Sequence, residues 1–252
     1  MQVFKTLMEV KENRGGGFLL LLDPDRSSAK SLLLLAEKAA EYHVDALLVG
    51  SSFIIQTGFH DMVRQIKNRA SVPVIIFPGS HSQISPYADA VLFTSLISGR
   101  NPLYLIEEQV RGAPLMKEYG LEPIPTGYML IDSGRATSVQ YVSGTYPIPA
   151  DKPDIACAHA LAAQYLGMKM VFMEAGSGAK ESVPEEMIAA VTGYIDLPVM
   201  VGGGLRQPEE IERRIQAGAS FVVVGNHFEA HDNLSALLEF TSAAHPTEQV
   251  HI

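Results

Sequence analysis

Residues 172–181, FMEAGSGAKE, place one carboxylate at the end of an apolar run and follow it with small residues. An acid at the mouth of a buried strand, here Glu174, is positioned to take a proton from a substrate. The glycines after it would let a phosphate group approach backbone N–H groups closely. A structural interpretation competes with this one, in which Ser177 caps the following helix and the glycines only form a tight turn.

Two further glycine-containing stretches follow apolar runs near the end of the chain. Residues 202–204 are three consecutive glycines, and Gly225 and Asn226 follow the run FVVV. In parallel α/β barrels, the loops after strands seven and eight often bind phosphate through backbone N–H groups and a helix N-terminus. Three glycines in a row cost chain entropy, so phosphate binding is favoured over simple tight-turn packing. Arg206, just beyond, lies either over this site or in solvent.

Asp23 stands directly after the apolar run FLLLL. A carboxylate there either caps the following turn through an Asx-type hydrogen bond or binds Mg²⁺. Mg²⁺ needs only one or two carboxylates when waters and substrate phosphate oxygens complete its shell, so Asp23 with the hydroxyl of Ser52 would suit an ion shared with a diphosphate. Asp25 competes for this role but is better explained as a surface or capping residue.

Eight short apolar runs recur along the chain, and most are followed by a turn and a helical pattern. They occupy residues 18–22, 46–50, 73–77, 90–94, 124–131, 169–173, 197–201 and 221–225. Continuous apolar runs are typical of parallel strands that are buried on both faces. Eight of them in 252 residues predict one domain over residues 1–252, a single (βα)8 or TIM barrel. In this fold the residues just after each strand share one face, so the acids, serines and glycines described above would converge on one mouth.

The connections between the runs are unequal. Helical patterns are readable at residues 29–43, 101–120, 151–167 and 207–218. Only residues 78–89, with two prolines and no apolar stripe, separate the third run from the fourth. We therefore predict that the third helix is missing or reduced. Residues 132–152 lack periodicity, and a loop of this length after a barrel strand is typical of a functional lid.

The composition argues against several classes of protein. The net charge is −9 and no block of Lys and Arg exists, which argues against a nucleic-acid partner. Cys157 is the only cysteine, which excludes an intrachain disulfide and a cysteine-based metal site. The longest apolar runs have about five residues, whereas a membrane-spanning helix needs about 20. With no signal-peptide pattern at the N-terminus, we expect a cytoplasmic protein without a transmembrane segment.

Five stretches taken together resemble the geranylgeranylglyceryl phosphate synthases and the related heptaprenylglyceryl phosphate synthases. They are LLDPDR at 21–26, LLVGSS at 47–52, FMEAGSGA at 172–179, VMVGGGLR at 199–206 and VVVGNHFE at 222–229. The likeness covers nearly the whole chain, and EAGSGA is a specific part of it, whereas the GGG and GN pieces occur in many phosphate-binding barrels. The barrel of this family has a replaced third helix, in agreement with the short segment 78–89.

The resemblance implies an Mg²⁺-dependent prenyltransferase. It would move a geranylgeranyl chain from its diphosphate to the 3-hydroxyl of sn-glycerol 1-phosphate and form an ether. Glu174 would be the base, and Asp23 and Ser52 would bind Mg²⁺. The sn-glycerol 1-phosphate site would comprise Phe172, Met173, Glu174, Ala175, Gly176, Ser177, Gly178, Gly203, Gly204, Gly225 and Asn226. The resemblance also implies a homo-oligomer, with the helix at 101–120 as part of its interface.

Two positions depart from the family pattern. The family usually has tyrosine where this chain has Phe172, so one hydroxyl contact to the glycerol phosphate would be absent. Ser51 stands where the family usually has glycine. Neither change removes the proposed base or the proposed metal ligands.

A prenyl chain needs an apolar trough, and the gap left by the short segment 78–89 would provide one. The candidate lining residues, each of which also suits ordinary core packing, are Phe53, Ile54, Phe77, Phe93 and Leu96. Three other functions remain open, the first from the resemblance and the other two from the residues alone. They are a heptaprenylglyceryl phosphate synthase, a sugar-phosphate isomerase or lyase with Asp23 and Glu174 as its acid and base, and a non-catalytic phosphate binder.

Overall fold

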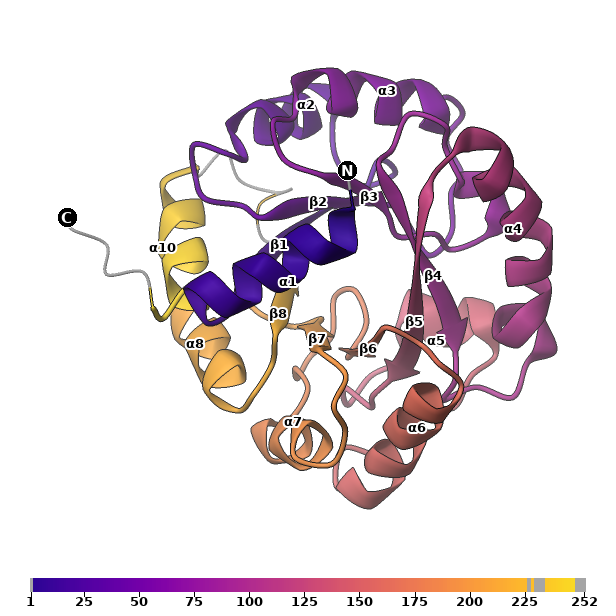
Figure 1. Ribbon diagram of the computed structural model, residues 1–252, viewed down its shortest axis with the longest axis vertical. Coiled ribbons are helices and arrows are strands. Elements are labelled where there is room, and N and C mark those ends of the chain that lie inside the picture. The colour runs from indigo at the N-terminus through magenta and orange to yellow at the C-terminus, as the bar shows by residue number, and fades with distance from the viewer. Residues whose placement is uncertain (1, 226–227, 229–233, 248–252) are drawn as a thin grey trace.

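The computed structural model describes residues 2–225, 228 and 234–247. Across these residues eight parallel strands pair in chain order, and β8 pairs with β1 to close a barrel (Figure 1). The strands are β1 (Gly17–Leu22), β2 (Ala46–Val49), β3 (Val74–Ile76), β4 (Ala90–Leu96), β5 (Glu122–Leu130), β6 (Met170–Glu174), β7 (Val199–Gly202) and β8 (Phe221–Val224). Each predicted apolar run forms one of these strands, so the predicted barrel is confirmed.

Helices surround the barrel in a ring (Figure 1). Those that follow a strand are α2 (Ala29–Lys38), α3 (Phe59–Arg69), α4 (Glu108–Tyr119), α6 (Pro153–Tyr165), α7 (Glu185–Thr192), α8 (Pro208–Gln216) and α10 (Leu234–Ala244). A π-helical turn, η2 (Leu103–Glu107), leads into α4, and the predicted lid segment contains a short helix, α5 (Ser138–Ser143). In the described part of the chain, no helix combines the length and apolar character that a membrane crossing requires.

The third helix is reduced to the 3₁₀ turn η1 (His81–Gln83), as the length of segment 78–89 predicted. The Gln83 side chain links this turn to the loop after β2. Its amide nitrogen donates to the Ser51 carbonyl at 2.8 Å, and its carbonyl oxygen accepts the Ser51 N–H at 3.3 Å. His81 contacts Glu108 of α4, with 2.9 Å between Nδ1 and Oε2. Side-chain contacts thus replace a packed helix here, and they leave room for a pocket.

Side chains along each strand alternate between the barrel interior and the surrounding helices, as the two-residue period of a strand requires. In β6, Met170 and Phe172 belong to the interior cluster, whereas Val171 and Met173 pack against the helices. Glu174 is two residues beyond Phe172 and therefore continues the interior series. Asp23 follows Leu19 and Leu21 of β1 in the same phase.

Helix α1 (Val3–Arg14), which the sequence analysis did not predict, lies across one end of the barrel (Figure 1). Val3 and Leu7 are fully buried in the interior cluster. The carboxylate of Glu122 accepts the backbone N–H groups of Val3 and, at 3.2 Å, of Phe4 at the free N-terminus of α1. Because Glu122 begins β5, α1 covers the end where the strands start and leaves the opposite mouth open for chemistry.

Candidate active site

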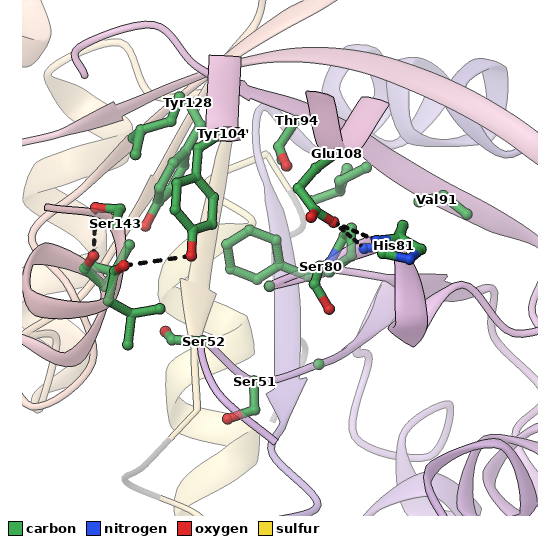
Figure 2. Close-up of a pocket in the computed structure, with 18 of the residues that line it drawn as sticks. Ser51, Ser52, Ser80, His81, Val91, Thr94, Tyr104, Glu108, Tyr128 and Ser143 are labelled. Carbon is green, nitrogen blue, oxygen red and sulfur yellow. Dashed lines mark hydrogen bonds and ion pairs between the residues drawn. The ribbon is translucent and has the colours of Figure 1, made fainter. Parts of the chain in front are cut away.

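A pocket lies at the carboxyl ends of the strands and continues into the space beside η1 (Figure 2). It brings together four predicted site residues, Asp23, Ser52, Glu174 and Ser177. Apolar and aromatic side chains make up most of the remaining wall, among them Leu21, Phe77, Ile84, Leu92, Phe93, Leu96, Tyr104, Val139 and Val142. The pocket therefore joins a polar mouth to an apolar trough.

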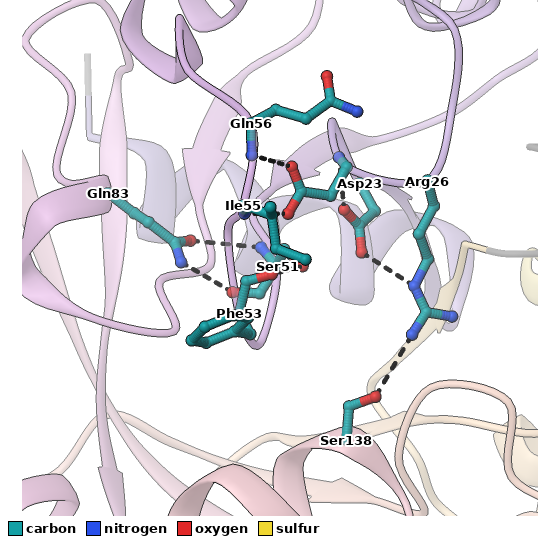
Figure 3. Close-up of polar contacts among 9 residues, drawn as sticks. Asp23, Arg26, Ser51, Phe53, Ile55, Gln56, Gln83 and Ser138 are labelled. Atoms are coloured by element: carbon teal, nitrogen blue, oxygen red, sulfur yellow. Dashed lines mark hydrogen bonds and ion pairs between the residues drawn. The ribbon is translucent and has the colours of Figure 1, made fainter.

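The predicted trough is partly correct. Phe77, Phe93 and Leu96 line the pocket, but Phe53 is 62% exposed and Ile54 packs against the cluster between the barrel and its helices. The predictions for Phe53 and Ile54 were wrong because of the path of the loop after β2. The Asp25 carboxylate accepts the N–H groups of Ile55 at 2.6 Å and Gln56 at 3.0 Å (Figure 3). These bonds hold residues 53–56 away from the pocket, whereas Ser51 and Ser52 at the start of the same loop line it. These bonds also assign Asp25 the capping role expected for it.

Glu174 is 7% exposed and accepts a hydrogen bond from the hydroxyl of Tyr128, with 2.5 Å between Tyr128 Oη and Glu174 Oε2. Burial raises the pKa of Glu174 to about 7, while the hydrogen bond from Tyr128 lowers it. A carboxyl group whose pKa lies near neutrality changes protonation state readily at physiological pH, which suits a general base. The burial and the pKa of Glu174 are compatible with the predicted role of general base, and that role stays a prediction.

Tyr128 is a site residue that the sequence analysis missed. The β5–β6 register pairs Tyr128 with Phe172, and its ring contacts those of Phe172 and Phe77 at centroid distances of 5.5 and 5.8 Å. Burial and the charge on Glu174 raise the pKa of Tyr128 well above its usual value, so the hydroxyl remains a donor. A tyrosine at an interior position of the predicted strand 124–131 was the signal available in the sequence.

Tyr128→Phe is expected to shift the acid limb of the pH–rate profile to higher pH by about one to two units, because a hydrogen bond to a charged group contributes about 1.5–3 kcal/mol. The ring packing would stay, but the Glu174 carboxylate would lose its donor, so its pKa would rise. The measurement is kcat/KM against pH. Tyr104→Phe is the matched control, since that hydroxyl donates to Val142 O at 3.4 Å and not to Glu174. If the acid limb of the profile had the same apparent pKa in Tyr128→Phe and in the wild type, Tyr128 would not set the pKa of Glu174.

Of the ten described residues predicted for the sn-glycerol 1-phosphate site, only Glu174 and Ser177 line the pocket, and three of the other eight have buried side chains. Phe172 is fully buried, with its ring 5.3 Å from that of Phe77 between centroids. Met173 faces the helices, and Ala175 is 1% exposed in the same outer cluster. Strand alternation explains this outcome for Met173 and Ala175, since only every second residue of β6 points into the barrel.

The glycine turns after β6 and β7 pack against each other. The β6–β7 register pairs Glu174 with Gly202, so the glycine run begins beside the carboxylate. Gly203 has φ +84°, and a Cβ there would lie 2.7 Å from the Gly176 nitrogen, so only glycine fits. Gly204 and Gly178 also belong to these turns, and Gly225 packs against Leu21. Asn226 lies outside the described residues. The glycines thus allow the two turns to pack closely against each other, and phosphate binding by these turns stays a prediction.

Neighbouring residues settle two further alternatives. Ser177 does not cap a helix, because α7 begins at Glu185 with Pro184 before it, and Ser177 instead lines the pocket. The guanidinium of Arg206 donates to the carbonyl oxygens of Ala179 at 2.6 Å and Lys180 at 3.3 Å. Arg206 therefore holds the turn after β6 in place and is not simply solvated.

Asp23 is 6% exposed at the pocket mouth (Figure 3). Its Oδ1 accepts the Asp25 N–H at 2.9 Å, which is the predicted Asx-type bond, and its Oδ2 lies 3.4 Å from Nε of Arg26. Burial raises the pKa of Asp23, and hydrogen bonds from the Asp25 N–H and the Ser51 hydroxyl and the charge of Arg26 lower it. The capping interpretation is thus correct, but the pocket position also leaves the metal interpretation open.

The residues around Asp23 would suit only an ion that takes most of its ligands from water and substrate. Within the described residues, no group of three or more His, Cys, Asp and Glu side chains could hold an ion. One carboxylate with the hydroxyl of Ser52 instead suits Mg²⁺ that receives its remaining ligands from water and diphosphate. Ser51 causes no strain where the family usually has glycine, because among described residues other than glycine only His43 has a positive φ.

Comparisons with known proteins identify relatives of this chain. The model of the PcrB family matches residues 8–242. The geranylgeranylglyceryl phosphate synthase of Chitinophaga pinensis is 43% identical over 99% of this chain and 98% of its own length. That of Thermococcus gammatolerans is 48% identical over 83% of each chain.

A solved structure extends the agreement to three dimensions. The (S)-3-O-geranylgeranylglyceryl phosphate synthase of Thermoplasma acidophilum, crystallised with its substrate sn-glycerol-1-phosphate, superposes with a TM-score of 0.92 at 34% identity. The superposition covers 98% of this chain and 99% of that one. The resemblance expected from the five motifs is thereby confirmed, and this chain belongs to the PcrB family.

Proposed function

We propose that this chain transfers a geranylgeranyl group from its diphosphate to the 3-hydroxyl of sn-glycerol 1-phosphate. The observation that carries the proposal is the position of Glu174, a buried carboxyl group with a pKa of about 7 where a polar mouth meets an apolar trough. The relatives of known name and the substrate bound in the Thermoplasma acidophilum enzyme support the same reaction.

The reaction assigns a task to each part of the pocket. The glycerol oxygen attacks C1 of the prenyl chain, the bond from C1 to the diphosphate oxygen breaks, and the hydroxyl proton passes to Glu174. Tyr128 donates to Oε2 of Glu174, which leaves Oε1 to accept the proton of the incoming hydroxyl in this proposal. Holding the hydroxyl beside the allylic carbon supplies much of the acceleration, and the carboxylate stabilises positive charge that develops there.

Asp23 and Ser52 are the residues that would hold Mg²⁺ in this proposal. When bound, the ion would neutralise the charge on the departing diphosphate. The glycine turns after β6 and β7, with Gly225 after β8, would bind the phosphate of sn-glycerol 1-phosphate through backbone N–H groups. The apolar wall beside η1 would bury the prenyl chain, at about 0.8 kcal/mol per CH₂.

Assembly and location also belong to the proposal. Ile106 of η2 and Val110 of α4 are 56% and 63% exposed, and such aliphatic side chains on one helical segment support a homo-oligomer interface there. A cytoplasmic location stays a prediction from the sequence.

The product of an incubation tests the function. The protein is incubated with Mg²⁺, sn-glycerol 1-phosphate and, separately, farnesyl, geranylgeranyl or heptaprenyl diphosphate, and the lipid product is identified by its mass. We expect geranylgeranylglyceryl phosphate, with little product from the enantiomer sn-glycerol 3-phosphate. Preference for the heptaprenyl donor would indicate a heptaprenylglyceryl phosphate synthase. No product from any donor would overturn the proposal and favour a sugar-phosphate enzyme or a non-catalytic binder, although the apolar trough argues against both.

A further inference from the structure

Arg26 connects the carboxylate after β1 with the helix beside the pocket mouth (Figure 3). Its Nε lies 3.4 Å from Oδ2 of Asp23, and its Nη2 lies 3.5 Å from the hydroxyl oxygen of Ser138 in α5. The side chain of Arg26 is 41% exposed, whereas that of Asp23 is 9% exposed. A buried carboxylate is therefore contacted by a guanidinium that is partly exposed to solvent.

The position of Arg26 has a chemical consequence for any divalent cation at Asp23. A guanidinium and a divalent ion both seek the same carboxylate oxygens, and their positive charges repel each other. Asp25 is engaged elsewhere, because its carboxylate already accepts the N–H groups of Ile55 and Gln56. The ion must therefore compete with Arg26 at Asp23.

A guanidinium displaced from Asp23 would remain at the pocket mouth, since the chain holds its backbone there. The Arg26 N–H donates to the Asp23 carbonyl oxygen at 3.2 Å, and the Ser27 N–H donates to the same oxygen at the same distance. The planar guanidinium presents N–H donors in a geometry that matches phosphate oxygens. In the proposed reaction the anion expected at this side of the pocket is the diphosphate.

We propose that Arg26 exchanges partners, neutralising Asp23 when no metal is bound and binding the diphosphate group of the prenyl substrate when Mg²⁺ takes Asp23. This inference rests on the proposed function, because it requires a diphosphate and a metal at the same mouth. It makes metal binding and diphosphate binding interdependent. Arg26 weakens the binding of the ion alone and strengthens the binding of the ion together with diphosphate.

The test measures binding without turnover. Free Mn²⁺, a paramagnetic substitute for Mg²⁺, is titrated with wild type, Arg26→Met and Arg26→Lys, and inorganic pyrophosphate binding is measured calorimetrically with saturating Mg²⁺. In Arg26→Met we expect Mn²⁺ alone to bind about threefold to tenfold more tightly, because the competing cation is gone. Pyrophosphate should bind about tenfold to a hundredfold more weakly, because charge-assisted hydrogen bonds are lost. Arg26→Lys should lie between the two.

Arg64→Met is the matched control. The Arg64 side chain is 50% exposed and pairs with Asp61 on α3, so both affinities should equal those of the wild type. Thermal unfolding of each variant shows whether the fold is intact, and Arg26→Gln replaces Arg26→Met if the latter is unstable.

The two affinities must move in opposite directions for the inference to stand. If Arg26→Met leaves both unchanged, or weakens both together, Arg26 has no exchange role. If the wild type binds pyrophosphate with Mg²⁺ and Arg26→Met binds it equally well, only the assignment of Arg26 fails. If the wild type binds no pyrophosphate even with Mg²⁺, the proposed function fails together with this inference.

Discussion

Glu174→Gln is expected to lower kcat for ether formation by about 10²- to 10⁴-fold, the usual contribution of a positioned general base. Glutamine has nearly the same shape as glutamate and still accepts the hydrogen bond from Tyr128. It cannot accept the proton of the glycerol hydroxyl. The KM for the prenyl diphosphate should change little, because the apolar wall and Asp23 are untouched. Single-turnover product formation gives the comparison directly.

The pKa of Glu174 makes both the stability and the activity of the wild type depend on pH, in opposite directions. Burial raises the pKa of Glu174 from 4.5 in the unfolded chain to about 7 in the folded protein. Below about pH 4.5 the group is neutral in both states, whereas above about pH 7 the folded protein must bury a charge, so stability falls as the pH rises between these values. Wild-type activity should fall in the opposite direction, as the pH drops below about 7, because the base becomes protonated.

Glu174→Gln should therefore be more stable than the wild type at pH 8 and unfold at a higher temperature. The difference in the free energy of unfolding should be up to roughly 3 kcal/mol at pH 8 and should disappear near pH 4. Glu181→Gln is the matched control, since this glutamate follows in the same turn with a side chain that is 70% exposed. It should alter neither activity nor stability. Full activity in Glu174→Gln, or a lower stability at pH 8, would rule out Glu174 as a buried base.

The barrel could be predicted from the sequence because its strands are buried on both faces and therefore appear as unbroken apolar runs. The reduced third helix was predictable because twelve residues with two prolines cannot hold a loop, a helix and a return loop. Helix α1 gave no comparable signal. Only Val3 and Leu7 of α1 are buried, and both pack into the interior cluster at the end of the barrel. The two buried residues alone are too few to form an amphipathic pattern that would predict a helix here.

Site residues could be predicted where their place follows from the end of a strand. They could not be predicted where their place depends on contacts with residues distant in the sequence. Glu174 and Asp23 directly end apolar strands, so their place at the mouth follows from the fold. Tyr128 lies inside a strand, and its contact with Glu174 depends on the β5–β6 register. Phe53 was misplaced because the carboxylate of Asp25, distant in sequence, fixes the loop that carries it. Local apolar character could not reveal that contact.

Asp23→Asn is expected to lower product formation at saturating Mg²⁺ by about 10²- to 10³-fold, because metal-assisted charge neutralisation is worth several kcal/mol. Asparagine can still accept the Asp25 N–H, so the turn after β1 should persist. The charge that would pair with a divalent ion in the proposed function is lost. Activity measured against Mg²⁺ concentration should show a much weaker dependence in the variant, and removal of Mg²⁺ by a chelator should abolish wild-type activity.

Asp25→Asn distinguishes the proposed metal ligand, Asp23, from Asp25, which anchors the loop after β2. Asp25 binds two backbone N–H groups, one through each carboxylate oxygen, and asparagine retains only one acceptor oxygen. We expect less than about a tenfold loss of activity and an unchanged dependence on Mg²⁺, since one retained hydrogen bond keeps most of the loop in place. Protection against thermal unfolding by sn-glycerol 1-phosphate should survive in both variants, because the glycine turns beside Glu174 contain neither aspartate. If the Mg²⁺ dependence were lost in Asp25→Asn and kept in Asp23→Asn, the metal ligand would be Asp25 and not Asp23. The ion and Arg26 would then not share a carboxylate, and the proposed competition between them would be ruled out.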